Sequence, residues 1–99
     1  MYAVREIVTC RPGKVRALVA KFKSLGGPLQ RIGLKPFRIL TDVSGGPFWT
    51  VVAEIEVDSL NAFFEIDNTL MADPEARQAM AGYHDLVQSG RREIYRVES

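Results

Sequence analysis

The sequence predicts an α+β fold in the order β-α-β-β-α-β. Stretches rich in β-branched and aromatic residues alternate with longer segments in which apolar residues recur every three or four positions. Runs of glycine, proline, serine and aspartate separate these stretches and predict the turns between them. A chain of 99 residues has room for a single hydrophobic core. We therefore expect one domain that spans residues 1–99.

The first strand is predicted over residues 2–10, which are rich in β-branched residues. It ends at Arg11-Pro12-Gly13, because proline cannot continue the hydrogen-bond ladder of a central strand. The segment from Val15 to Ile32 shows the spacing of one helix face. Its Gly26-Gly27-Pro28 run predicts a kink or a broken last turn. The apolar positions of this face are Leu18, Val19, Phe22, Leu25, Leu29 and Ile32.

A β-hairpin is predicted next. Residues 37–43 alternate in polarity, and the turn-forming run Ser44-Gly45-Gly46-Pro47 follows them. The return strand, residues 48–57, has the clearest alternation in the chain, which predicts one buried face. That face consists of Trp49, Val51, Ala53, Ile55 and Val57.

A second helical segment follows in two pieces. Asp58-Ser59 offers cap oxygens for the first piece, and Asp73-Pro74-Glu75 starts the second with proline at its first helical position. We expect the second piece to end near Ser89-Gly90 and the last strand to cover residues 92–97. The side chains expected to be buried on the first piece are Leu60, Phe63, Phe64 and Leu70.

This order predicts a ferredoxin-like plait, in which a four-stranded antiparallel sheet carries two helices on one face. The other face of the sheet would then be bare, although Leu40, Phe48 and Val52 are expected there. An uncovered apolar sheet face tends to associate, and a second copy of the chain is the simplest cover. We therefore expect a homodimer.

Charge and composition exclude several classes of function. The 13 basic and 12 acidic side chains give a net charge of +1, which argues against non-specific binding to nucleic acid or to anionic membranes. No apolar run approaches the ~20 residues that span a bilayer, and the start lacks a signal peptide's apolar stretch, so we expect a cytoplasmic protein. Cys10 and His84 are too few for a disulfide or a structural metal site.

Motifs of nucleotide and RNA chemistry are absent. The chain has no match to the aromatic motif of RNA-recognition domains, and its glycine pairs lack the spacing of phosphate-binding loops. Pro12 stands where an acylphosphatase-like cradle would need a backbone amide.

Charge is segregated along the chain. Residues 1–40 hold nine basic side chains and one acidic, whereas residues 41–99 hold four basic and eleven acidic. The basic helical segment could receive an anionic partner. The favoured interpretation is pairing with the neighbouring acidic helix, at Glu65, Asp67, Asp73 and Glu75.

His84 is the only histidine, the residue type best suited to carry protons near neutral pH, so it is the candidate catalytic residue. Helical periodicity places it beside Tyr83, near the layer between helices and sheet, and Trp49 is expected to point to that layer from the hairpin. The alternative is a surface or packed histidine at a helix end and a tryptophan that is simply part of the core. Cys10 is interpreted as a packed thiol, and Glu54 or Glu56 as ion-pair partners of Arg38 or of a second copy.

The layout as a whole resembles a known superfamily. The segments that carry the resemblance are Pro12-Gly13-Lys14 after the first strand, Phe37-Arg38 with Phe48-Trp49, Asp58-Ser59-Leu60, Asp73-Pro74-Glu75-Ala76, and Arg92-Glu93-Ile94-Tyr95. Together they resemble the dimeric α/β-barrel superfamily, near its NIPSNAP-like and antibiotic-biosynthesis-monooxygenase-like members. The resemblance implies that two plaits pack sheet to sheet, and that small ligands lie between a subunit's own helices and sheet.

The resemblance also bears on cofactors. Trp49 and His84 loosely match the Trp and His of heme-degrading members, but the Asn of those enzymes corresponds most nearly to Ile7. We therefore expect no cofactor, and heme held by His84 is the alternative.

The functional hypothesis is a protein that binds a small, largely apolar organic molecule in a pocket lined by Trp49, Tyr83 and His84, as a cofactor-independent monooxygenase-like enzyme. The alternative is a non-catalytic, stress-related or accessory protein–protein interaction module. That alternative predicts no deep pocket.

Overall fold

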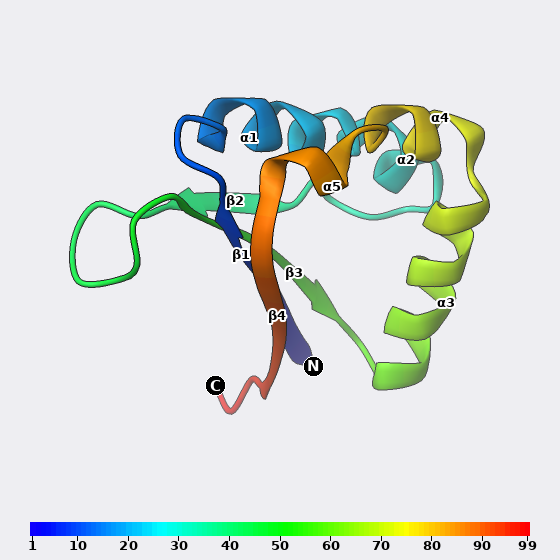
Figure 1. Ribbon diagram of the computed structural model, residues 1–99. Helices are drawn as coiled ribbons and strands as arrows, with labels where there is room; N and C mark the ends of the chain where they lie inside the picture. Colours follow the sequence, from blue (N-terminus) through cyan, green and yellow to red (C-terminus); the bar gives the residue numbers. More distant parts are fainter.

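The computed structural model describes all residues from 1 to 99 and consists of one sheet and five helical segments (Figure 1). The strands are β1 (Tyr2–Cys10), β2 (Arg38–Thr41), β3 (Thr50–Val57) and β4 (Val87–Arg96). The helices are α1 (Val15–Ser24), α2 (Gly26–Arg31), α3 (Leu60–Ala72), α4 (Pro74–Ala79) and α5 (Tyr83–Leu86).

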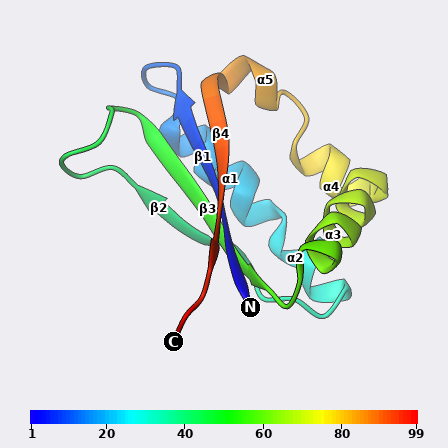
Figure 2. The same cartoon turned by 90° about the horizontal axis from the view of Figure 1, so that it is seen from below.

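The sheet has the strand order β2-β3-β1-β4, and every neighbouring pair is antiparallel. The central strand β1 pairs on both sides, so that Val4 lies between Ile55 of β3 and Ile94 of β4. The helices lie on one side of the sheet, and none covers its other face (Figures 1 and 2). The predicted ferredoxin-like α+β fold is confirmed.

The first helical segment breaks where glycine and proline predicted a break. α1 ends at Ser24 and α2 begins at Gly26, with Leu25 between them. The apolar face continues across this break, because Leu18 of α1 and Leu29 of α2 are both fully buried. One buried stripe therefore runs along two helices.

The second helical segment begins and breaks at its predicted caps. The Oγ of Ser59 accepts a hydrogen bond of 3.0 Å from the amide of Ala62, which satisfies a free donor of the first turn of α3. Asp73 ends α3 and caps α4, and Pro74 occupies the first turn of α4.

The prediction for the last strand was wrong at its start. α4 ends at Ala79, and Gly82, with a φ of 80°, adopts the left-handed conformation before the short helix α5. β4 then starts at Val87, because Ser89 and Gly90 pair with β1 rather than forming a turn. The register shifts between Thr9 and Cys10, which absorbs the irregular start of the ladder.

A single core cluster lies between the sheet and the helices. Its alternating members on β3 match the predicted buried face from Val51 onward. The 14 residues of the core are Val4, Val8, Cys10, Leu18, Val19, Phe22, Leu25, Leu29, Val51, Ala53, Ile55, Val57, Phe63 and Ala76. Cys10 is fully buried, and burial raises the pKa of its thiol, as befits a packed side chain.

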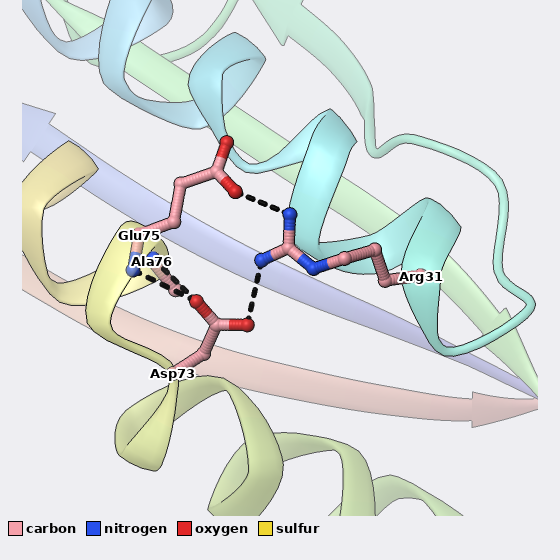
Figure 3. Close-up of polar contacts among 4 residues, drawn as sticks. All are labelled: Arg31, Asp73, Glu75 and Ala76. Atoms are coloured by element: carbon pink, nitrogen blue, oxygen red, sulfur yellow. Dashed lines mark hydrogen bonds and ion pairs between the residues drawn. The ribbon is translucent and has the colours of Figure 1, made fainter.

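Arg31, at the end of α2, links the two helical segments (Figure 3). Its guanidinium donates to Asp73 at 2.7 Å and also to Glu75. These bonds lower the pKa of Asp73, since the Arg31 hydrogen bond favours the charged carboxylate. The predicted pairing of basic and acidic helices is confirmed at this contact, between the end of α2 and the start of α4. Lys21 instead donates to the backbone oxygen of Ala81.

The outer face of the sheet carries a second set of ion pairs. Glu54 of β3 bonds Arg5 of β1 at 2.7 Å and lies 4.0 Å from Arg38 of β2, so the predicted Arg38 partner is Glu54. None of the helices has the length and apolar character needed to cross a membrane.

Candidate functional site

A cavity of about 550 Å³ lies between the sheet and the helices. It is the best-formed concave, mainly apolar space in the molecule, of the size that small organic ligands occupy. Its apolar lining comes from β1, β3, all the helices except α2, and the loops beside them: Val4, Phe22, Leu25, Phe37, Ile55, Phe63, Ile66, Leu70, Met71, Ala76, Met80 and Tyr83.

Aromatic rings hold one side of the cavity together. Phe22 of α1 meets Phe37 edge to face, with the ring centroids 6.1 Å apart, and meets Tyr83 in the same way at 6.5 Å. The amphipathic spacing of α1 explains this position, because Phe22 lies one turn beyond the buried residues Leu18 and Val19. The rings thus connect α1 to α5 across the cavity wall.

Polar side chains also line the cavity, namely Glu6, Asp67, Arg77, His84 and Arg92. Glu6 and Arg92 face each other across β1 and β4, and the Nε of Arg92 donates to a carboxylate oxygen of Glu6. The guanidinium carbon of Arg92 lies 4.8 Å from the ring centroid of Phe63, which is buried. An ion pair and a cation–π contact therefore hold Arg92 in place.

Tyr83 and His84 both line this cavity from α5. Their rings meet edge to face with centroids 5.4 Å apart. Burial raises the pKa of the Tyr83 hydroxyl, and the nearby carboxylate of Glu6 adds to the effect. The Tyr83 hydroxyl is therefore neutral at physiological pH, and the His84 side chain is exposed to solvent.

Trp49 does not lie with them, so the expectation that all three side chains line one pocket was wrong. Its φ of 67° is left-handed, which is uncommon for a residue with a bulky side chain, and takes it out of the strand alternation that begins at Thr50. Trp49 instead lines a shallower hollow with Gly13, Val15, Arg16, Thr41, Asp42 and Phe48.

Glu6 and Arg92 are the site residues that the sequence analysis missed. The signal was present in β1, because strict alternation puts Glu6 on the same face as the core residues Val4 and Val8. A lone acid on a buried face requires a partner, but only the strand order shows that β4 supplies it.

The cavity offers a bound molecule an apolar lining and a few polar contacts. Carboxylates, guanidinium groups, one imidazole and one phenol can orient a bound molecule, and His84 can accept or donate a proton. No group of three or more His, Cys, Asp or Glu side chains lies close enough together to hold a metal ion.

The fold and the cavity define a ferredoxin-like α+β protein with a partly open cavity between sheet and helices. Solved structures with this fold include NIPSNAP-family and antibiotic biosynthesis monooxygenase-like proteins. A NIPSNAP domain protein from Burkholderia xenovorans superposes with a TM-score of 0.81 at 16% identity, covering 100% of this chain and 96% of its own.

Two further structures agree. A NIPSNAP family protein of unknown function from Agrobacterium tumefaciens gives a TM-score of 0.78 at 21% identity, covering 96% of this chain and 86% of its own. An antibiotic biosynthesis monooxygenase-like protein from Nitrosomonas europaea gives 0.75 at 13% identity and covers 100% of both chains. At these identities the likeness concerns the fold. The sequence matches no protein-family model and no curated protein.

Proposed function

We propose that this protein binds a small, largely apolar organic molecule in the cavity between its helices and its sheet. The observation that carries the proposal is the cavity itself, about 550 Å³ with 12 hydrophobic residues among the 17 that line it. Tyr83 and His84 are among the polar side chains that line it. An interaction module that acts through its surface alone has no need of such a space, so the cavity favours ligand binding over that alternative.

The binding test uses N-phenyl-1-naphthylamine, an uncharged probe that fluoresces when it enters an apolar site. We expect saturable binding with one probe per chain. Met80→Trp fills the cavity and weakens binding, whereas Trp49→Ala, in the separate hollow, leaves it unchanged. Binding that is unsaturable, or equal in Met80→Trp and the unaltered protein, would sink the proposal.

The natural occupant is sought by native mass spectrometry of the freshly purified protein. Extra mass on the chain identifies the class of molecule bound. Heme is one occupant to be tested, since His84 is the only imidazole of the cavity. A heme ligated by His84 gives a shifted, sharpened absorption band on titration, and His84→Ala abolishes that band.

A monooxygenase-like reaction without a cofactor is the activity to assay, by analogy with the monooxygenase-like fold neighbours. In this scheme His84 takes a proton from the bound substrate before dioxygen reacts. The expected effect of His84→Ala is a loss of oxygen uptake of about 10²–10⁴-fold. Binding of the uncharged probe should persist in the same variant, which separates catalysis from binding.

The functional unit we propose is a homodimer formed through the outer face of the sheet. Ile7, Val52 and Leu40 lie side by side there on β1, β3 and β2, and no helix covers them. The Arg5–Glu54–Arg38 ion pairs on the same face give it both charges, which a two-fold interface can match against itself. Native mass spectrometry should give a dimer, and Val52→Glu should give a monomer that keeps its helical content.

A further inference from the structure

Arg92 is held in the cavity by only part of its guanidinium group. Its Nε donates to Glu6, and the face of the group lies over the ring of Phe63. No protein atom accepts a hydrogen bond from Nη1 or Nη2, although each carries two N–H donors. The contacts with Glu6 and Phe63 therefore orient the guanidinium group, and the fork formed by its two terminal nitrogens has no protein partner.

Arg5 is held in a similar way, with its Nε on Glu54 and its guanidinium carbon 5.3 Å from the ring centroid of Tyr95, but it lies on the outer face of the sheet and not in the cavity. Arg31 uses both of its terminal nitrogens on Asp73 and Glu75, and it lies at a helix corner outside the cavity. Arg91, next to Arg92 in β4, has its Nε 2.9 Å from Glu93 on the opposite face of the sheet. Among these side chains, Arg92 alone lines the cavity while its terminal nitrogens have no protein partner.

The charged side chains that line the cavity also bear on what Arg92 can bind. Glu6 is already engaged by Arg92, so its negative charge is compensated. Arg77 lines the cavity from α4 and makes no ion pair, and His84 adds a further donor. Asp67 is the single carboxylate of the lining that has no partner. The lining therefore holds two acidic and two arginine side chains, and the donors without a carboxylate partner are Nη1 and Nη2 of Arg92 and the guanidinium of Arg77.

We propose that the cavity binds an apolar organic acid, with the carboxylate held by Nη1 and Nη2 of Arg92 and the apolar body against Phe22, Phe63 and Leu70. This proposal rests on the proposed ligand-binding function and names the substrate class of that site. A planar carboxylate matches the two parallel N–H directions of the fork, and both hydrogen bonds would be charge-assisted. Arg92 is thus the residue that sets ligand specificity.

The test compares 1-naphthylacetate with 1-naphthylacetamide, which has the same shape without the charge. Both are titrated into the protein by calorimetry or by displacement of N-phenyl-1-naphthylamine. We expect the acid to bind at least about tenfold more tightly than the amide, because hydrogen bonds to a charged group are the stronger ones. The comparison on the unaltered protein needs no variant, so it holds even where a substitution disturbs folding.

Arg92→Gln removes the fork and should bring the ratio of acid to amide affinity close to one; the ratio is the readout, because a general change of the cavity affects both ligands alike. Arg92→Lys keeps the charge without the fork and should give an intermediate ratio. Arg91→Gln is the matched control, since it removes a neighbouring guanidinium from the other face and should leave the ratio as it was.

The outcomes separate the two proposals. If the uncharged probe fails to bind, the proposed function itself is wrong. If the probe binds but acid and amide bind alike, or Arg92→Gln keeps the preference for the acid, the cavity binds small molecules and the acid specificity of Arg92 is wrong.

Discussion

Helices α1 and α3 belong to the same layer, yet they relate to the sheet in different ways. α1 buries Leu18, Val19 and Phe22 within 10 residues. α3 is longer, at 13 residues, and buries only Phe63. Its Phe64 and Met71 are 54% and 67% exposed. In Figure 1, α1 lies over the sheet, whereas α3 descends at the edge of the molecule.

The difference teaches that an apolar helix face does not by itself specify close packing. α1 carries its apolar residues in a narrow stripe and packs against β2 and β3. α3 carries apolar residues on more than one side, and its inner residues Phe63, Ile66 and Leu70 line the cavity. Close packing of α1 therefore contributes mainly to stability, whereas α3 contributes mainly to the cavity.

The largest expected effect on the free energy of unfolding concerns α1. Leu18→Ala should lower the free energy of unfolding by about 2–5 kcal/mol, because it leaves a cavity in a fully packed region. Urea unfolding followed by circular dichroism measures this loss. A loss below about 1 kcal/mol would mean that α1 packs no more closely than α3.

The next effect concerns the start of α3. Ser59→Ala removes the only side-chain acceptor at that end of the helix and should cost about 1 kcal/mol. The same urea experiment applies, with Ser59→Asp as the control, since aspartate also caps helices well. Equal losses for both variants would show that the cap contributes nothing specific.

The corner between α3 and α4 should give a smaller, pH-dependent effect. The pKa of Asp73 is lowered from its ordinary value of 3.8, so the carboxylate stabilises the folded state above that pH. This contribution disappears as the pH falls through the lower folded pKa. Asp73→Asn keeps a capping oxygen and loses the charge.

The urea midpoints of Asp73→Asn and the unaltered protein should therefore differ at neutral pH and converge in acid. A difference that persists unchanged below the ordinary pKa would contradict this account and would point to lost capping geometry instead.

The smallest effect is expected on the exposed side of α3. Phe64→Ser should change the free energy of unfolding by no more than about 0.5 kcal/mol, since the ring is already more than half exposed. A clearly larger loss in a dimeric sample, absent from a monomeric one, would place Phe64 in the subunit contact.

Most of the fold could be predicted because its signals are local. The alternation of β3, the break at Gly26-Gly27-Pro28 and the caps at Ser59 and Asp73 all lie within a few residues of the feature they specify. The start of β4 was missed because Ser89-Gly90, a turn signal in isolation, is held in the ladder by β1.

The site could be predicted less well because its geometry is not local. Tyr83 and His84 line the cavity from the short helix α5, after the predicted helix has broken at Gly82. Trp49 was misplaced because alternation assumes an extended backbone, and its left-handed φ violates that assumption. Arg92 could be recognised only once β1 and β4 were known to be neighbours.

The two capped ends of α3 have a consequence for the size of molecule that the cavity can hold. Ser59 fixes one end directly after β3, and Asp73, itself bonded to Arg31, fixes the other. Between them Phe63 is the only buried side chain of the helix, and Ile66 and Leu70 are partly buried against the core. The side of the cavity that α3 forms is therefore bounded by these three side chains between two fixed helix ends, so their size limits how wide a bound molecule can be.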